Sequence, residues 1–238
     1  MSEESAESAA DAALGAGGSR PPDFDIVDQR DPQQVLQSDL VFDGRIWSVR
    51  RDTVRLPGGE EVVREVVDHP GAVGIIALDD QDRVALIRQY RHAVKSYLWE
   101  APAGLIDVDG EPPLLTAQRE LFEETHLRAD TWHLLVDYYN SPGGSTEAFR
   151  CFLARDVSEV EGERHPAEDE EVDMPLRWVP LDDAVAKALA GELHNPTSVA
   201  CVLAAYASRA LGWTTLRPPD SPWPERFPDG LPSAADID

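Results

Sequence analysis

The sequence predicts an α/β fold in which a β-sheet carries helices on its faces. Two short, continuous apolar runs, 72–78 and 84–90, suit strands that are covered on both sides. From 114 to 127 the apolar residues change to a helical spacing. Strand and helix patterns are then mixed up to about residue 211, and such a mixture predicts helices packed on a sheet.

A β-hairpin is predicted ahead of the apolar runs, because 45–55 and 61–68 flank the turn signal Pro57–Gly59. The first helix starts at Pro112 and Pro113, where the missing N–H groups cost nothing. The elements predicted after that helix are strands at 132–139, 148–154 and 176–179 and helices at 182–189 and 197–211.

The two ends of the chain differ from this central part. Residues 1–35 have few large apolar side chains, which predicts a disordered or loosely attached acidic tail. Residues 214–238 contain six prolines, which predicts an extended, irregular tail. Between the tails we expect an N-terminal antiparallel sheet at 36–70 and the main domain at 71–213.

The chain is strongly acidic. Its 238 residues include 21 Lys and Arg against 45 Asp and Glu, which gives a formal net charge of −24. Binding to nucleic acid or to an anionic membrane surface requires a basic footprint, so the composition argues against both kinds of partner.

The two cysteines, Cys151 and Cys201, form no CxxC pair and no disulfide framework, which is typical of a reducing cytoplasm. The chain contains no run of 18 apolar residues that could span a membrane. Its N-terminus lacks the basic start and apolar core of a secretory signal. We therefore expect a cytoplasmic protein.

The chemical signal lies in Glu111 and in the segment Arg119–Glu124. On a helix, Glu120 and Glu124 occupy one face and Glu123 lies beside them. Carboxylates that converge to roughly 4 Å in a partly buried cleft repel each other by about 4 kcal/mol. A hard cation such as Mg²⁺ offsets that repulsion, because it takes oxygen ligands. Taken alone, the cluster is more typical of a solvated acidic helix face.

The longer pattern favours the metal site. It consists of Glu111, seven further residues, and then Arg119–Glu124. This pattern resembles the signature of the Nudix hydrolases, which cleave a nucleoside diphosphate linked to another group. Six residues separate Gly104 from Glu111 where the family has five, and His126 stands where the family has glycine. Neither departure touches a metal ligand, and histidine reaches positive φ more readily than most residues.

The flanking residues resemble the ADP-ribose pyrophosphatase subgroup of that family. Pro142 lies 15 positions after Leu127, within the segment 141–147, and a proline at about that distance marks the subgroup. Arg64-Glu65 and the segment 88–91 are also similar. The resemblance implies a Nudix fold, a mixed β-sheet sandwiched between helices. It also implies a homodimer whose small N-terminal antiparallel sheets swap between subunits.

The resemblance implies Glu120 and Glu124 as direct Mg²⁺ ligands, with Glu123 close by; Mn²⁺ is the expected substitute. It adds the backbone carbonyl of Ala103 as a ligand, and Arg119 as a support for the catalytic helix. In the subgroup the base that activates water lies in an acidic loop after the signature. Here that loop corresponds to 168–173, where Glu170 aligns best and Glu171 second; the alternative is a solvated loop of like charges.

The positions that the resemblance assigns to substrate binding are Arg64, Arg91, Glu100, Gly143, Gly144 and Glu147. An anionic diphosphate that approaches so acidic a protein needs cations, and arginine offers a planar bidentate fork. Glycines allow the backbone to approach a phosphate or a ribose closely. The alternatives are surface ion pairs for the arginines and an ordinary turn for the glycines.

The expected activity is Mg²⁺-dependent hydrolysis of the diphosphate of ADP-ribose, which gives AMP and ribose 5-phosphate. Two alternatives stay open. One is the same reaction on another nucleoside diphosphate sugar, such as GDP-mannose. The other is a Nudix module that senses ADP-ribose without cleaving it.

Overall fold

The computed structural model describes residues 26–160 and 174–232 of the chain. The chain divides into two compact units, Met1–Gln34 and Val35–Asp238. The fold described below is that of the second unit. Within the described residues, none of the helices combines the length and the hydrophobicity that a membrane span requires.

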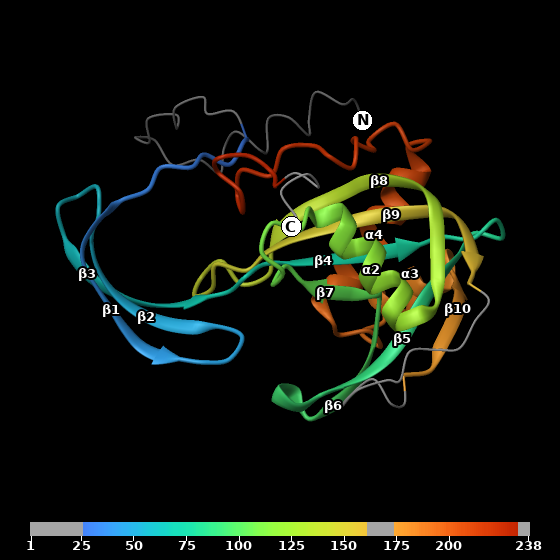
Figure 1. Cartoon of the computed structure of the whole chain (residues 1–238), viewed down its shortest axis with the longest axis horizontal. Helices are drawn as coiled ribbons and strands as arrows, with labels where there is room; N and C mark the ends of the chain where they lie inside the picture. Colours follow the sequence, from blue (N-terminus) through green and yellow to red (C-terminus); the bar gives the residue numbers. More distant parts are fainter. Residues whose placement is uncertain (1–25, 161–173, 233–238) are drawn as a thin grey trace, which may run out of the picture. The chain divides into compact units, whose positions relative to one another are not determined.

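A four-stranded mixed sheet forms the centre of the fold (Figure 1). Its order is β7 (Ala103–Leu105), β4 (Ala72–Ala77), β9 (Ala148–Glu159) and β8 (Leu127–Tyr139). The pair β4–β9 is parallel, and the pairs β4–β7 and β8–β9 are antiparallel. All six residues of β4 are buried, as the continuous apolar run predicts.

A second sheet of three strands contains the other apolar run. Its order is β10 (Leu176–Pro180), β5 (Arg83–Arg91) and β6 (Ser96–Glu100), and both pairs are antiparallel. A short 3-10 helix, η1 (His92–Val94), joins β5 to β6. The sequence does not predict the short strands β6 and β7, because they span only five and three residues, too few for a clear alternation of apolar and polar side chains.

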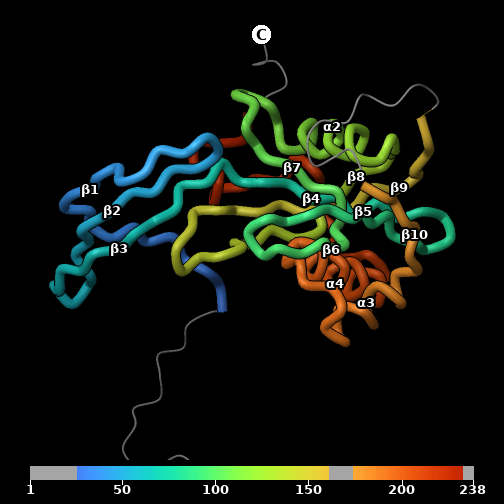
Figure 2. Tube along the Cα trace, turned by 90° about the horizontal axis from the view of Figure 1, so that it is seen from below, coloured from blue at the N-terminus to red at the C-terminus, as the bar shows by residue number. Residues whose placement is uncertain are grey.

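Helices cover both faces of the four-stranded sheet. Helix α2 (Pro113–Thr125) lies on one side, and α3 (Leu181–Leu189) and α4 (Pro196–Ala210) lie on the other (Figure 2). The predicted sandwich is therefore confirmed. Neighbouring residues of β4 point to opposite faces: Val73 packs in the same cluster as Leu121 of α2, and Ala72 in the cluster of α4.

The N-terminal antiparallel sheet has three strands, β1 (Gln34–Asp43), β2 (Ser48–Arg55) and β3 (Glu61–Asp68), in that order. The pair β2–β3 is the hairpin expected from the sequence, with Arg51 opposite Glu65. Every residue of β1 is exposed, so its apolar side chains are incompletely covered by the described part of the chain.

The proline-rich C-terminal segment packs on the domain as far as Leu231. Its Trp223 is only 1% exposed and belongs to the cluster that contains Leu121 of α2. The buried Arg150 guanidinium lies over the Trp223 ring, 4.6 Å from its centroid. An irregular segment therefore supplies one of the largest side chains of the core.

Candidate active site

The short strand β7 brings Gly104 directly under helix α2. A Cβ atom on Gly104 would lie 2.0 Å from the Cδ atom of Glu120, well inside any allowed contact. Glycine is therefore the residue type that lets the Glu120 carboxylate lie against the strand. Burial raises the pKa of Glu120 to about 7, an effect that Arg119 opposes.

Glu124 lies one turn further along α2 and faces the same strand. Its Oε2 atom accepts a hydrogen bond of 3.0 Å from the backbone N–H of Ala103. Burial raises the pKa of Glu124 well above its usual range, and the nearby Glu120 charge raises it further. Two partly buried carboxylates that disfavour each other's ionisation are suited to a hard divalent cation, because its charge offsets both the loss of solvation and the repulsion.

Arg119 ties the start of the motif to the helix. Its Nε and Nη2 atoms donate to the two oxygens of Glu111 at 3.2 and 3.0 Å. Its Nη1 atom donates to Glu120 at 2.8 Å and to Glu123 at 3.0 Å. No motif of the sequence points to Thr116, whose hydroxyl donates to Glu111 at 2.9 Å from the first turn of α2. Arg119 and Thr116 together hold Glu111.

Glu123 is more exposed than Glu120, with which it shares the Arg119 Nη1 atom. Its side chain is 43% exposed and is bonded to Arg119, whereas Glu120 and Glu124 turn toward β7. Within 26–160 and 174–232, no three acidic, histidine or cysteine side chains are already grouped as a metal site. The two carboxylates at β7 are therefore the pair that could hold a cation.

Arg91 and Glu100 form an ion pair next to these carboxylates. Glu100 is 1% exposed, and the Nε and Nη2 atoms of Arg91 donate to it at 2.6 to 3.2 Å. Arg91 lowers and Glu100 raises the pKa of Glu124, so both charges lie within electrostatic reach of it. The structure thus brings these two predicted positions to the same site.

The segment 141–147 forms a turn anchored to the end of β3. The carbonyl of Gly144 accepts a hydrogen bond of 2.8 Å from the Val67 N–H. A Cβ atom on Gly143 or Gly144 would meet nothing within 4 Å, so neither glycine is required by a close approach within the chain. Glu147 accepts a hydrogen bond of 2.7 Å from Asn140.

Arg64 is not brought to the other predicted positions within one chain. It lies on β3 of the N-terminal sheet, where it is exposed and donates to the carbonyl of Val63 at 2.9 Å. The two candidates for the base, Glu170 and Glu171, lie outside the described residues.

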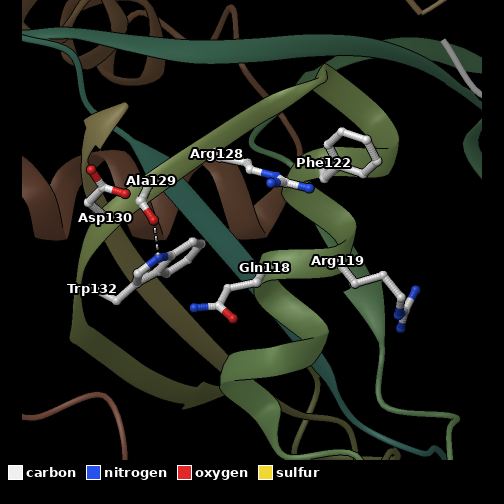
Figure 3. Close-up of a pocket in the computed structure, with 7 residues that line it drawn as sticks. All are labelled: Gln118, Arg119, Phe122, Arg128, Ala129, Asp130 and Trp132. Carbon is white, nitrogen blue, oxygen red and sulfur yellow. Dashed lines mark hydrogen bonds between the residues drawn. The ribbon is translucent and has the colours of Figure 1, made fainter. Parts of the chain in front are cut away.

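A separate pocket of about 330 Å³ lies between α2 and the start of β8 (Figure 3). Arg128 is positioned over the Phe122 ring, 5.3 Å from its centroid, and Trp132 donates to the Ala129 carbonyl at 2.9 Å. None of the helix glutamates lines this pocket, and Figure 3 shows the Arg119 side chain extending away from Trp132. We therefore do not place a diphosphate there.

The sandwich of helices and mixed sheet, with carboxylates facing a glycine-bearing strand, defines a Nudix-fold protein. A crystal structure of an ADP compounds hydrolase has this fold with a TM-score of 0.64 and 22% sequence identity. The similarity covers 78% of this chain and 99% of that one.

The NUDIX domain model matches residues 68–199, and the model of the nucleoside diphosphate sugar hydrolase N-terminal domain matches residues 34–67. The chain belongs to the Nudix hydrolase family. It is 46% identical to an ADP-ribose pyrophosphatase of Mycobacterium tuberculosis, over 81% of this chain and 92% of the relative. It is 33% identical to an ADP-ribose pyrophosphatase of Bacillus subtilis, over 68% of this chain and 86% of the relative. It is 31% identical to a GDP-mannose pyrophosphatase of Cronobacter sakazakii, over 64% of this chain and 82% of the relative.

Proposed function

We propose that the protein hydrolyses the diphosphate of ADP-ribose to AMP and ribose 5-phosphate in a reaction that depends on Mg²⁺. The partly buried pair Glu120 and Glu124, set against Gly104, is the observation that carries the proposal. The ADP-ribose pyrophosphatases among the relatives, which match most of the chain, support the choice of substrate.

Glu120 and Glu124 would hold the cation, with Glu123 and the Ala103 carbonyl as further candidates; Mn²⁺ is the expected substitute. When bound, Mg²⁺ polarises a diphosphate and stabilises the charge of the leaving group. Arg119 keeps Glu120 in place and holds Glu111 at the entry to the helix. Glu170 or Glu171 would take the proton from the attacking water.

Arg64 and Arg91 would bind the anionic diphosphate, since guanidinium groups match phosphate oxygens in pairs. Arg91 is 42% exposed although it is paired with Glu100, so its side chain is accessible to a substrate. Glu100, Gly143, Gly144 and Glu147 are the remaining proposed contacts of the substrate.

The protein would act as a homodimer formed through the N-terminal sheet. Alternate residues of β1 point to opposite faces, and Leu36, Leu40 and Phe42 share one of them. These side chains are 37%, 63% and 57% exposed, which is typical of a surface awaiting a partner. Such a dimer would also explain how Arg64 reaches a site, because it would be the site of the second subunit.

We expect no nucleic acid and no membrane among the partners, since the net charge of −24 opposes both. A cytoplasmic location is supported by the two cysteines, which are free and buried.

Turnover of ADP-ribose with Mg²⁺, compared between the wild type and Glu124→Gln, tests the proposal. The amide keeps an oxygen for the Ala103 N–H but removes the charge, so we expect turnover to fall by at least about 10²-fold. Because an isolated buried charge is costly, the variant should unfold at no lower temperature than the metal-free wild type. Glu192→Gln, which alters an exposed carboxylate paired with Lys187, is the matched control and should leave turnover unchanged.

GDP-mannose is tested in parallel, because GDP-mannose pyrophosphatases are among the relatives. If only GDP-mannose is hydrolysed, the proposed metal site stands, but ADP-ribose is not the substrate. Binding of ADP-ribose without cleavage under any divalent metal would show a sensor instead of an enzyme.

A further inference from the structure

The C-terminal segment is held to the domain by a buried arginine. Arg150 is 0% exposed; its Nη1 atom donates to the Ser221 carbonyl at 2.7 Å and its Nη2 atom to the Pro222 carbonyl at 3.0 Å. The same guanidinium lies over the Trp223 ring and pairs with Asp137 at 2.7 Å. The position of the segment along the domain is therefore fixed by directional bonds as well as by burial.

Three residues after Trp223, Arg226 contacts the linker between β3 and β4. Its Nε atom donates to the Pro70 carbonyl at 2.5 Å. A Cβ atom on Gly71 would lie 3.2 Å from the Cδ atom of Arg226, so the side chain packs directly on the linker. Within the described residues, no carboxylate lies at ion-pair distance from Arg226. Its contact with the linker is thus a hydrogen bond and packing, without a neutralising partner.

The linker in turn contacts both sides of the candidate site. The Gly71 carbonyl accepts a hydrogen bond of 3.1 Å from the N–H of Ile106, which directly follows β7. The His69 N–H donates to the Thr146 hydroxyl at 2.9 Å, and His69 Nδ1 accepts from Gly71 at 3.0 Å. A shift of the linker would therefore reach the residue that follows β7 and the segment 141–147.

We infer that Arg226 is a positioning residue for substrate binding, which acts by holding the Pro70–Gly71 linker through its Nε–H group. The inference depends on the proposed function, because the role of the segment 141–147 in substrate binding is part of that proposal. Glu120 and Glu124 are held by α2 and β7 themselves, so the effect of Arg226 falls on binding more than on the chemical step.

Three variants separate the hydrogen bond from the charge. Arg226→Gln places an N–H on Cδ, where arginine has Nε, and removes the charge. Arg226→Met removes both, and Arg226→Lys keeps the charge. We expect Arg226→Met to raise KM for ADP-ribose by about 2- to 10-fold, the factor that one intramolecular hydrogen bond is worth, with kcat nearly unchanged. Arg226→Gln should keep KM close to that of the wild type.

If Arg226→Gln raises KM as much as Arg226→Met does, and Arg226→Lys keeps the wild-type KM, the charge acts on the substrate and the positioning role is overturned. An unchanged KM in the Met variant would overturn it as well. Arg209→Met is the matched control, because Arg209 is also half-buried but bridges Asp82 and Asp182. It should leave KM unchanged.

Hydrogen exchange gives a readout that needs no activity. In Arg226→Met the amides of Ile106 and Thr146 should exchange faster, since they donate to the carbonyls of Gly71 and Val67. In Arg226→Gln and in the Arg209→Met control, their exchange should be unchanged. If the wild type cleaves no nucleotide sugar, the proposed function fails while this measurement still tests the positioning. Unchanged exchange in the Met variant would overturn the inference.

Discussion

At the scale of single residues, two effects oppose the repulsion between the helix carboxylates. The sequence predicts charges that converge and require a counter-charge. In the structure Arg119 supplies part of that charge, and burial raises the pKa of Glu120 to about 7, so this group is partly neutral near pH 7. This raised pKa of Glu120 follows from its burial in the fold, which the sequence does not show.

Gly104→Ala tests the contact between strand and helix. The new Cβ atom would collide with the Glu120 carboxyl group, so that group must leave its position against β7. We expect kcat to fall by roughly 10²-fold, since a misplacement of about 1 Å at a site can have that effect. Turnover and circular dichroism measure the loss and the retention of the fold.

The control is Gly58→Ala, because a Cβ atom on Gly58 would meet nothing within 4 Å. Full activity of Gly104→Ala would show that Glu120 does not need its present position.

At the scale of elements, helix α2 ends at the residue where the sequence departs from the family pattern. His126 adopts φ 58° and ψ 25°, the left-handed conformation that glycine usually supplies. Its N–H donates to the Phe122 carbonyl at 2.8 Å, and its ring contacts the Phe122 ring with 5.1 Å between centroids. Histidine thus replaces glycine without changing how the helix stops.

The variants His126→Gly and His126→Ala isolate the backbone effect, because both lose the ring contact with Phe122. We expect His126→Gly to be more stable than His126→Ala by about 1 kcal/mol, the cost of a left-handed conformation for a residue with a Cβ atom. Urea denaturation measures the difference in the free energy of unfolding. Equal stabilities would contradict a strained helix end.

At the scale of the whole molecule, residues distant in sequence complete the core. Trp223 comes from an irregular, proline-rich segment, yet it packs with Leu121 of α2 and Phe152 of β9. Trp223→Ala should lower the free energy of unfolding by about 3–5 kcal/mol, because it leaves a large cavity. Thermal or urea denaturation checks this, with Leu189→Ala, 73% exposed, as a control expected within about 0.5 kcal/mol of the wild type.

A second whole-molecule prediction concerns the dimer. Leu40→Lys places a charge on the more apolar face of β1, so the mass in solution, measured by light scattering, should fall toward that of one chain. Gln37→Lys adds the same charge on the opposite face of the strand and should leave the dimer intact. A wild type that is monomeric at all concentrations would contradict the proposal.

The sequence alone determined the elements whose signals are local. Helix α2, predicted at 114–127, is found at Pro113–Thr125, and the apolar runs become β4 and β5. The spacing of Glu120 and Glu124 placed them on one face before any fold was known. Strand β8 begins at Leu127, earlier than the predicted 132, because Leu127 was included in the predicted helix and Ala129 and Asp130 have low β propensity.

Only the tertiary structure decided which surfaces these elements meet. The approach of Gly104 to Glu120, the burial of Glu124 and the contact of Arg226 with Pro70 each join residues from separate segments. Such contacts depend on how the sheet brings distant strands together, and the pattern of a single segment carries no record of its neighbours. The chemistry of the glutamates could therefore be predicted from the sequence, whereas their environment could not.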